Sequence, residues 1–145
     1  MTIAVIDGQG GRMGALLVEA MRRAGIGAPH RVLAIGTNAL ATSAMLRAGA
    51  DQGATGENAI VVCARQAELI LAPIGMVLCD AMLGEVTATM AAAVGSSPAH
   101  KILIPISRCQ TTIAGLPALT LSEAVSAAVQ TAVGLVRDRQ GTPVR

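Results

Sequence analysis

Glycine is concentrated in one short stretch near the start of the sequence, IAVIDGQGGRMG, residues 3–14. Gly8, Gly11 and Gly14 fit the spacing G-x-x-G-x-x-G, whereas the pattern G-x-G-x-x-G fails at its last position, Met13. Glycines in such a turn allow positive φ, bring backbone N–H groups close to a phosphate and let a helix pack tightly on a strand. The stretch therefore predicts either a phosphate-binding loop or a purely structural corner.

The candidate ligand contacts in this loop are Asp7, Gly8, Gln9, Gly10, Gly11, Arg12, Met13 and Gly14. The Asp7 carboxylate would repel a phosphate unless it is protonated, turned away or bridged by a cation. Asp7 can equally be a plain turn residue ahead of a glycine. An enzyme would need an acid or base, for which Asp7 or Glu57 are the candidates, and the sequence leaves open whether there is a reaction.

The elements that would position this loop follow from hydrophobic periodicity. We expect strands at 2–6, 31–36, 51–54, 67–75 and 101–106, and helices at 14–25, 38–49, 57–67, 75–97 with an interruption near Gly84, and 120–139. In the stretch 50–67 a strand at Ile60 to Val62 is the alternative to the helix. Strands alternating with helices predict one α/β domain over residues 1–145, with a mainly parallel, Rossmann-like sheet and helices on both faces.

Ligands of such sheets bind beyond the carboxyl ends of the strands. At the end of the second strand, NAD-binding domains usually have an acidic residue, and this sequence has Gly36, Thr37 and Asn38 there. Thr37 and Asn38, together with Arg12, would suit the 2′-phosphate of NADP or another polar group. Gly75 lies at the carboxyl end of the fourth expected strand and completes the expected rim on that side.

Arg108 and Cys109 follow the last expected strand. A guanidinium at that place can fork onto phosphate oxygens, with a surface ion pair as the rival interpretation of Arg108. Cys109 beside it is expected to be a small packing residue rather than a reactive thiol.

Composition excludes several classes of protein. The chain has 145 residues, a net charge of +2 with scattered basic residues, and no Phe, Tyr or Trp, which argues against a nucleic-acid partner. Its longest apolar run, 69–79, is shorter than the ~20 residues of a membrane span, and no targeting segment is evident, so we expect a cytoplasmic protein. Three cysteines and two histidines form no metal-ligand spacing.

Two family resemblances come from these same residues. The run Gly-Arg-Met-Gly after the first strand is similar to the amino-terminal loop of dihydrodipicolinate reductases, which implies NAD(P)H-type cofactor geometry, but the catalytic histidine-rich segment of that family is missing. Longer blocks, AIGTNALATSAMLRAGADQGATGENAIVV, PIGMVLCDAMLGEVT and ILIPISRC, resemble the bacterial domain-of-unknown-function family 3842 over nearly the whole chain. That resemblance implies one small domain and no established activity.

Three hypotheses follow. The favoured one is a domain that binds a nucleotide or another phosphorylated small molecule at the glycine loop, for which valine at Gly8 or Gly11 should abolish binding while the fold survives. The second is an NADP-dependent oxidoreductase. The third is a structural module that forms a homo-oligomer through the small side chains of the last helix, Ala124, Ala127, Ala128 and Ala132, which could equally pack on the chain's own sheet.

Overall fold

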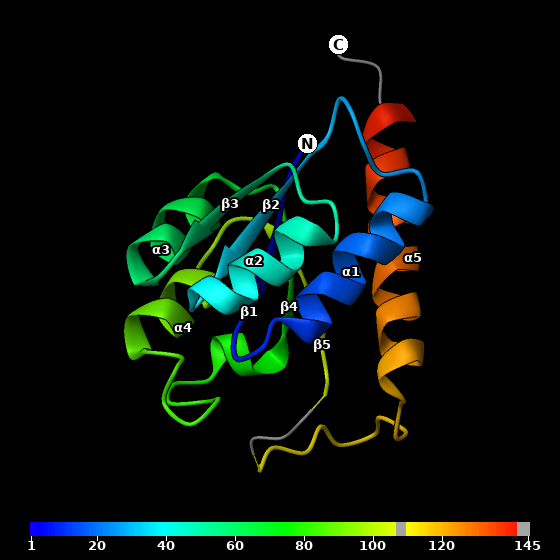
Figure 1. Ribbon diagram of the computed structural model, residues 1–145. Coiled ribbons are helices and arrows are strands. Elements are labelled where there is room, and N and C mark those ends of the chain that lie inside the picture. Colours follow the sequence, from blue (N-terminus) through cyan, green and yellow to red (C-terminus); the bar gives the residue numbers. More distant parts are fainter. Residues whose placement is uncertain (107–109, 142–145) are drawn as a thin grey trace.

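The computed structural model describes residues 1–106 and 110–141 (Figure 1). Strands and helices alternate along this part of the chain. The elements are β1 (Thr2–Asp7), α1 (Arg12–Arg23), β2 (Arg31–Gly36), α2 (Ala39–Arg47), β3 (Gln52–Thr55), α3 (Glu57–Gln66), β4 (Leu69–Pro73), the 3-10 helix η1 (Ile74–Val77), α4 (Ala88–Gly95), β5 (His100–Ile104) and α5 (Leu121–Gly141).

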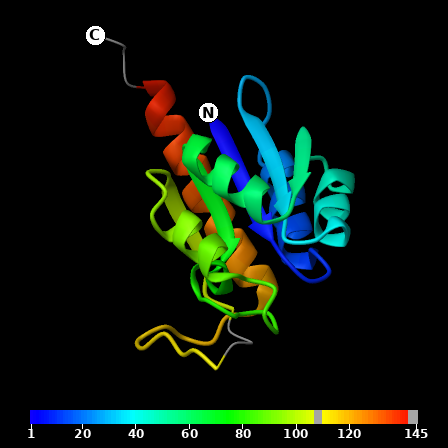
Figure 2. The same ribbon diagram turned by 90° about the vertical axis from the view of Figure 1, so that its left-hand side faces the viewer.

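The strands form one five-stranded sheet in the order β3-β2-β1-β4-β5, and every pair is parallel. Helices α1, α2 and α5 cover one face, and α3 and α4 cover the other (Figures 1 and 2). Side chains alternate along β1, so that Ile3 and Val5 belong to one apolar cluster and Ala4 and Ile6 to the other. The expected Rossmann-like, parallel α/β architecture is confirmed.

Most of the expected helices and strands are present in the structure at or near the residues that predicted them. Asn38 caps α2 by accepting a hydrogen bond from the Ala41 N–H at 2.9 Å, and α5 begins with a reciprocal pair in which Thr120 and Glu123 each accept from the other's N–H. The ambiguous stretch 50–67 contains the short edge strand β3 and the helix α3. The strand alternative at 60–62 is therefore wrong.

The expected helical region 75–97 is wrong in its first half. After η1, residues 78–86 form a run of turns that we call the connecting segment, and α4 begins only after its cap residue Thr87. Asp80, Met82 and Leu83 have φ of 63°, 58° and 57°, values that no helix tolerates. Contacts with the glycine loop hold the connecting segment in this conformation, as described below, and they override its helical pattern.

The last helix packs its small side chains on the chain's own core. Ala124, Ala128 and Ala132 are buried in the cluster between α1, α5 and the sheet, whereas Ala127 is exposed. These three residues are therefore not available for the oligomer contact considered above, and a homo-oligomer stays a prediction. In the described ranges, 1–106 and 110–141, every helix is too short or too polar to cross a bilayer.

Candidate functional site

The glycine loop joins the carboxyl end of β1 to the start of α1. Gly11 has φ +71° and donates its N–H to the Gly8 carbonyl oxygen at 2.9 Å, which closes the turn. A Cβ at Gly11 would lie 2.6 Å from Cα of Ala41, so the backbone of α2 leaves room only for glycine. The expectation that valine at Gly11 would leave the fold intact is therefore wrong.

The loop has one open glycine. A Cβ added at Gly10 would meet no atom within 4 Å, and its φ is not in the left-handed region. Gly14, in contrast, packs against Asp7 and Met45, where a Cβ would lie 2.9 Å and 2.4 Å from the nearest atoms. Close packing thus explains Gly11 and Gly14, while nothing in the described fold requires glycine at Gly10.

Asp7 lies beneath the loop and holds it. Its side chain, in a residue only 5% exposed, accepts the N–H of Gly8 at 2.8 Å and the N–H of Gly14 at 2.7 Å. Burial raises the pKa of Asp7 above its ordinary value, against the effect of the two N–H groups, and the negative charge of Glu85 adds to the rise. Both carboxylate oxygens are engaged in the loop's own backbone.

Glu85 reaches the loop from the connecting segment. Its carboxylate accepts the N–H of Gln9 at 3.0 and 3.1 Å, the hydroxyl of Thr37 at 2.5 Å and the amide Nδ2 of Asn38 at 2.7 Å. Burial alone would raise the pKa of Glu85, but the hydrogen bonds from Thr37, Asn38 and Gln9 outweigh it, so that pKa is lowered. No acidic residue directly follows β2 in the sequence, and the carboxylate of Glu85 occupies that place instead.

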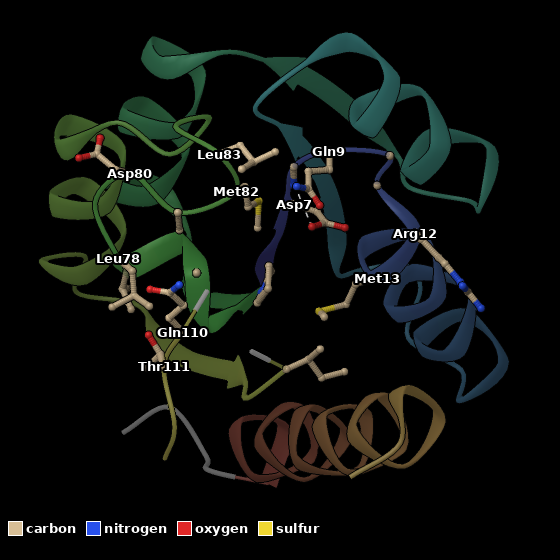
Figure 3. A pocket seen from close by; sticks show the side chains of 18 of the residues that line it. Asp7, Gln9, Arg12, Met13, Leu78, Asp80, Met82, Leu83, Gln110 and Thr111 are labelled. Atoms are coloured by element: carbon tan, nitrogen blue, oxygen red, sulfur yellow. Dashed lines mark hydrogen bonds between the residues drawn. The ribbon is translucent and has the colours of Figure 1, made fainter. Parts of the chain in front are cut away.

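A pocket of about 1010 Å³ opens beside the glycine loop. It lies over the carboxyl ends of β1 and β4, where the strand order reverses, which is the usual ligand position in open parallel sheets. The connecting segment and the start of α5 form the walls, and Figure 3 shows Met13 and Met82 pointing toward the cavity. The described lining residues are Asp7 to Met13, Pro73, Gly75, Val77 to Leu83, Ile106, Gln110, Thr111, Leu119 and Leu121.

Several of the expected site residues are brought together here. The loop residues Asp7 to Met13 and, from η1, Gly75 line the pocket. Gly14, Thr37 and Asn38 do not belong to the described lining, because Gly14 lies under the loop and the other two face Glu85. Arg108 and Cys109 lie outside the described residues. The contributions of Met82, Gln110 and Leu119 were not expected, because they come from irregular connections without a periodic signal.

The charged groups around the pocket offer little for acid–base chemistry. The exposed side chain of Arg12 runs along the outside of α1, and that of Asp80 points away from the cavity (Figure 3). Glu57, the other candidate acid, accepts the hydroxyl of Thr87 at 2.6 Å and is not among the described lining residues. Within residues 1–106 and 110–141 there is no cluster of three metal-ligating side chains.

Fold and site together define a small parallel α/β domain with a glycine loop at the topological switch point of its sheet. The comparisons agree with this class: the chain belongs to the family described as Domain of unknown function (DUF3842), whose model matches residues 2–137. The resemblance inferred from the sequence blocks is thereby confirmed. No curated protein and no solved structure matches the chain.

Proposed function

We propose that this protein binds the phosphate group of a nucleotide or of another phosphorylated small molecule at its glycine loop. The observation that carries the proposal is a set of three backbone N–H groups, those of Gly10, Arg12 and Met13, which make no hydrogen bond to the described part of the chain. All three belong to residues that line the 1010 Å³ pocket. N–H groups at the start of a helix and in a glycine turn are a recurrent phosphate cradle.

The other N–H groups of the loop already have partners, and this division supports the proposal. Asp7 takes those of Gly8 and Gly14, and Glu85 takes that of Gln9. The dipole of α1 adds a partial positive charge at the same place, and the first turn of that helix contains no acidic side chain that would neutralise it.

The charge of Asp7 does not prevent phosphate binding. Its carboxylate is turned inward, both oxygens accept N–H groups, and burial shifts the group toward its neutral form by raising its pKa. The Arg12 side chain points away from the pocket (Figure 3), so the proposed phosphate contacts are the backbone N–H groups of Gly10, Arg12 and Met13. The contact expected from Arg108 stays a prediction.

The described residues do not fit NADP. The place beyond β2 that would take its 2′-phosphate contains the Glu85 carboxylate, which already uses Thr37 and Asn38. A phosphate set against that carboxylate would be repelled. The structure thus offers no support for an NADP-dependent oxidoreductase.

A charge placed at the open glycine tests the proposal. Gly10→Asp adds a carboxylate where a Cβ meets no atom within 4 Å, so the fold should be kept. Charge repulsion at ~4 Å amounts to about 1 kcal/mol in water and more near a protein surface, so affinity for adenosine 5′-monophosphate (AMP) should fall at least about fivefold. Gly95→Asp, at an equally open position in α4, is the matched control and should bind as the wild type does.

Equilibrium dialysis suits this measurement, because a chain without Trp or Tyr scarcely absorbs where the nucleotide does. Gly10→Ala should retain binding, since a methyl group fits at that position. Equal affinities of the wild type, Gly10→Asp and Gly95→Asp would place any AMP binding away from the loop and refute the proposal. Absence of binding of AMP and of inorganic pyrophosphate by the wild type would refute it as well.

A further inference from the structure

We infer that Glu85 determines the class of ligand: it closes the β2 side of the glycine loop and restricts the site to compact phosphate monoesters, excluding dinucleotides. The inference rests on the proposed function and goes beyond it by assigning a specificity-determining residue and a direction to the bound molecule. Three features of the structure carry it: the space above Gly8, the partners of Glu85, and the position of the pocket.

The first feature is the space above the loop. In sheets of this type a dinucleotide crosses the glycine loop from the end of the second strand toward the fourth. Here a Cβ added at Gly8 would lie 2.6 Å from Sδ of Met82, 2.9 Å from Oγ1 of Thr37 and 3.4 Å from Oε1 of Glu85. The connecting segment therefore fills the track that the middle of a dinucleotide would follow.

The second feature is the set of donors around Glu85. Its Oε1 accepts from the backbone of Gln9 in the loop and from the side chains of Thr37 and Asn38. Thr37 and Asn38 are the polar groups at the end of β2 that could otherwise bind a ribose. Asn38 also donates to the Gln9 carbonyl oxygen at 2.9 Å, which closes the bridge between α2 and the loop. A ribose in this position would have to break the bridge.

The third feature is the open direction. The pocket extends from the loop toward Gly75, Ile106 and the start of α5, and its described lining includes neither Thr37 nor Asn38. The aliphatic side chains of Leu119 and Leu121 also line the pocket on this side. A ligand whose single phosphate meets the N–H groups would therefore direct an uncharged body toward β4, β5 and α5.

The connecting segment keeps this position against an unfavourable backbone conformation. Asp80, Met82 and Leu83 all have φ in the left-handed region, which L residues with side chains seldom adopt. The hydrogen bonds of Glu85, together with that of the Asp80 N–H to the Val86 carbonyl oxygen at 2.8 Å, hold the segment in place. Removing the carboxylate should therefore free the segment from the loop.

The test compares AMP with NADH, which contains the same nucleoside monophosphate within a dinucleotide. Affinity for NADH is read from its fluorescence and affinity for AMP from equilibrium dialysis. The wild type should bind AMP at least tenfold more tightly than NADH. Glu85→Ala should raise the ratio of the affinity for NADH to the affinity for AMP at least tenfold over its wild-type value.

Thr37→Val provides a second variant that leaves the connecting segment unchanged in sequence. It removes one donor to Glu85 while keeping the shape of the side chain. The affinity for NADH should therefore rise, but by less than in Glu85→Ala. Circular dichroism at 222 nm confirms that each variant is folded. If Glu85→Ala does not fold, the Thr37→Val result decides the matter.

Other outcomes separate this inference from the proposed function. Wild-type protein that binds NADH as tightly as AMP, and loses NADH in Glu85→Ala, would show that Glu85 accepts a ribose hydroxyl and would overturn the inference alone. Unchanged NADH affinity in both variants would overturn it too. Failure of the wild type to bind AMP, pyrophosphate and NADH would refute the proposed function and this inference with it.

Discussion

Asp7→Ala should destabilise the protein strongly, because it leaves two buried donors without acceptors. In the wild type the N–H groups of Gly8 and Gly14 donate to Asp7 at 2.8 and 2.7 Å. An unsatisfied buried group costs about 1–3 kcal/mol, so the expected loss in the free energy of unfolding is about 2–6 kcal/mol when both donors are stranded. That is a large share of the ~5–15 kcal/mol of a typical domain.

Urea denaturation followed by circular dichroism at 222 nm measures this loss without aromatic residues. Asp7→Asn is the matched comparison: its side-chain oxygen still accepts one N–H while its amide faces the other, so about half of the loss is expected. The difference between wild type and Asp7→Asn also depends on pH. Because the folded-state pKa of Asp7 is raised, its contribution to stability is fully present below its ordinary pKa and declines as pH rises through the folded-state value.

An unfolding free energy of Asp7→Ala within about 0.5 kcal/mol of the wild-type value would contradict the role assigned to Asp7, because ordinary surface substitutions fall in that range. A wild type that gains stability relative to Asp7→Asn as pH rises through the folded-state pKa of Asp7 would contradict the account of its burial. Both results come from the same denaturation curves, recorded at several pH values.

Three further predictions follow from the same structure. Gly11→Ala should lower the free energy of unfolding by about 1–3 kcal/mol or more, because it combines a left-handed φ with a Cβ 2.6 Å from Ala41 Cα. A change below about 0.5 kcal/mol would contradict this close approach. Gly134→Ala, at an open position inside α5, should stabilise the protein by about 0.5–1 kcal/mol in thermal or urea unfolding, and a loss of stability would show an unseen contact. Glu85→Gln should lower the free energy of unfolding near neutral pH, because the pKa of Glu85 is lowered in the folded state. The stability that Glu85 contributes is present above its ordinary pKa and is lost as pH falls through the folded-state value. A difference in unfolding free energy between wild type and Glu85→Gln that stays constant with pH would refute this.

Local signals in the sequence were sufficient for most of the fold. The short apolar stretches of β1, β2 and β4 alternate with helices along the chain, and right-handed crossovers through those helices place the strands parallel in one sheet. Asn38 and Thr120 were recognisable as caps, since a polar side chain before an apolar period serves the free N–H groups of a helix. These features depend on neighbours only a few residues apart, which a sequence displays directly.

The connecting segment could not be predicted, because its conformation depends on distant contacts. Residues 75–97 have a composition that suits a helix, yet Glu85 gains hydrogen bonds to Gln9, Thr37 and Asn38, which precede it by 47 to 76 residues. Such partners are invisible to periodicity. The pocket wall formed by this segment was missed for the same reason, whereas the loop residues Asp7 to Met13 were found because their glycine spacing is a local signal.

Amide chemical shifts test the central claim most directly, since the proposed contacts are backbone N–H groups. A ¹H–¹⁵N correlation spectrum of the labelled protein would be titrated with AMP. The account predicts that the amides of Gly10, Arg12 and Met13 shift most, in a saturable manner, while those of Gly8 and Gly14, bound to Asp7, shift less. Saturable shifts elsewhere with unchanged Gly10, Arg12 and Met13 amides, or no shifts at all, would contradict it.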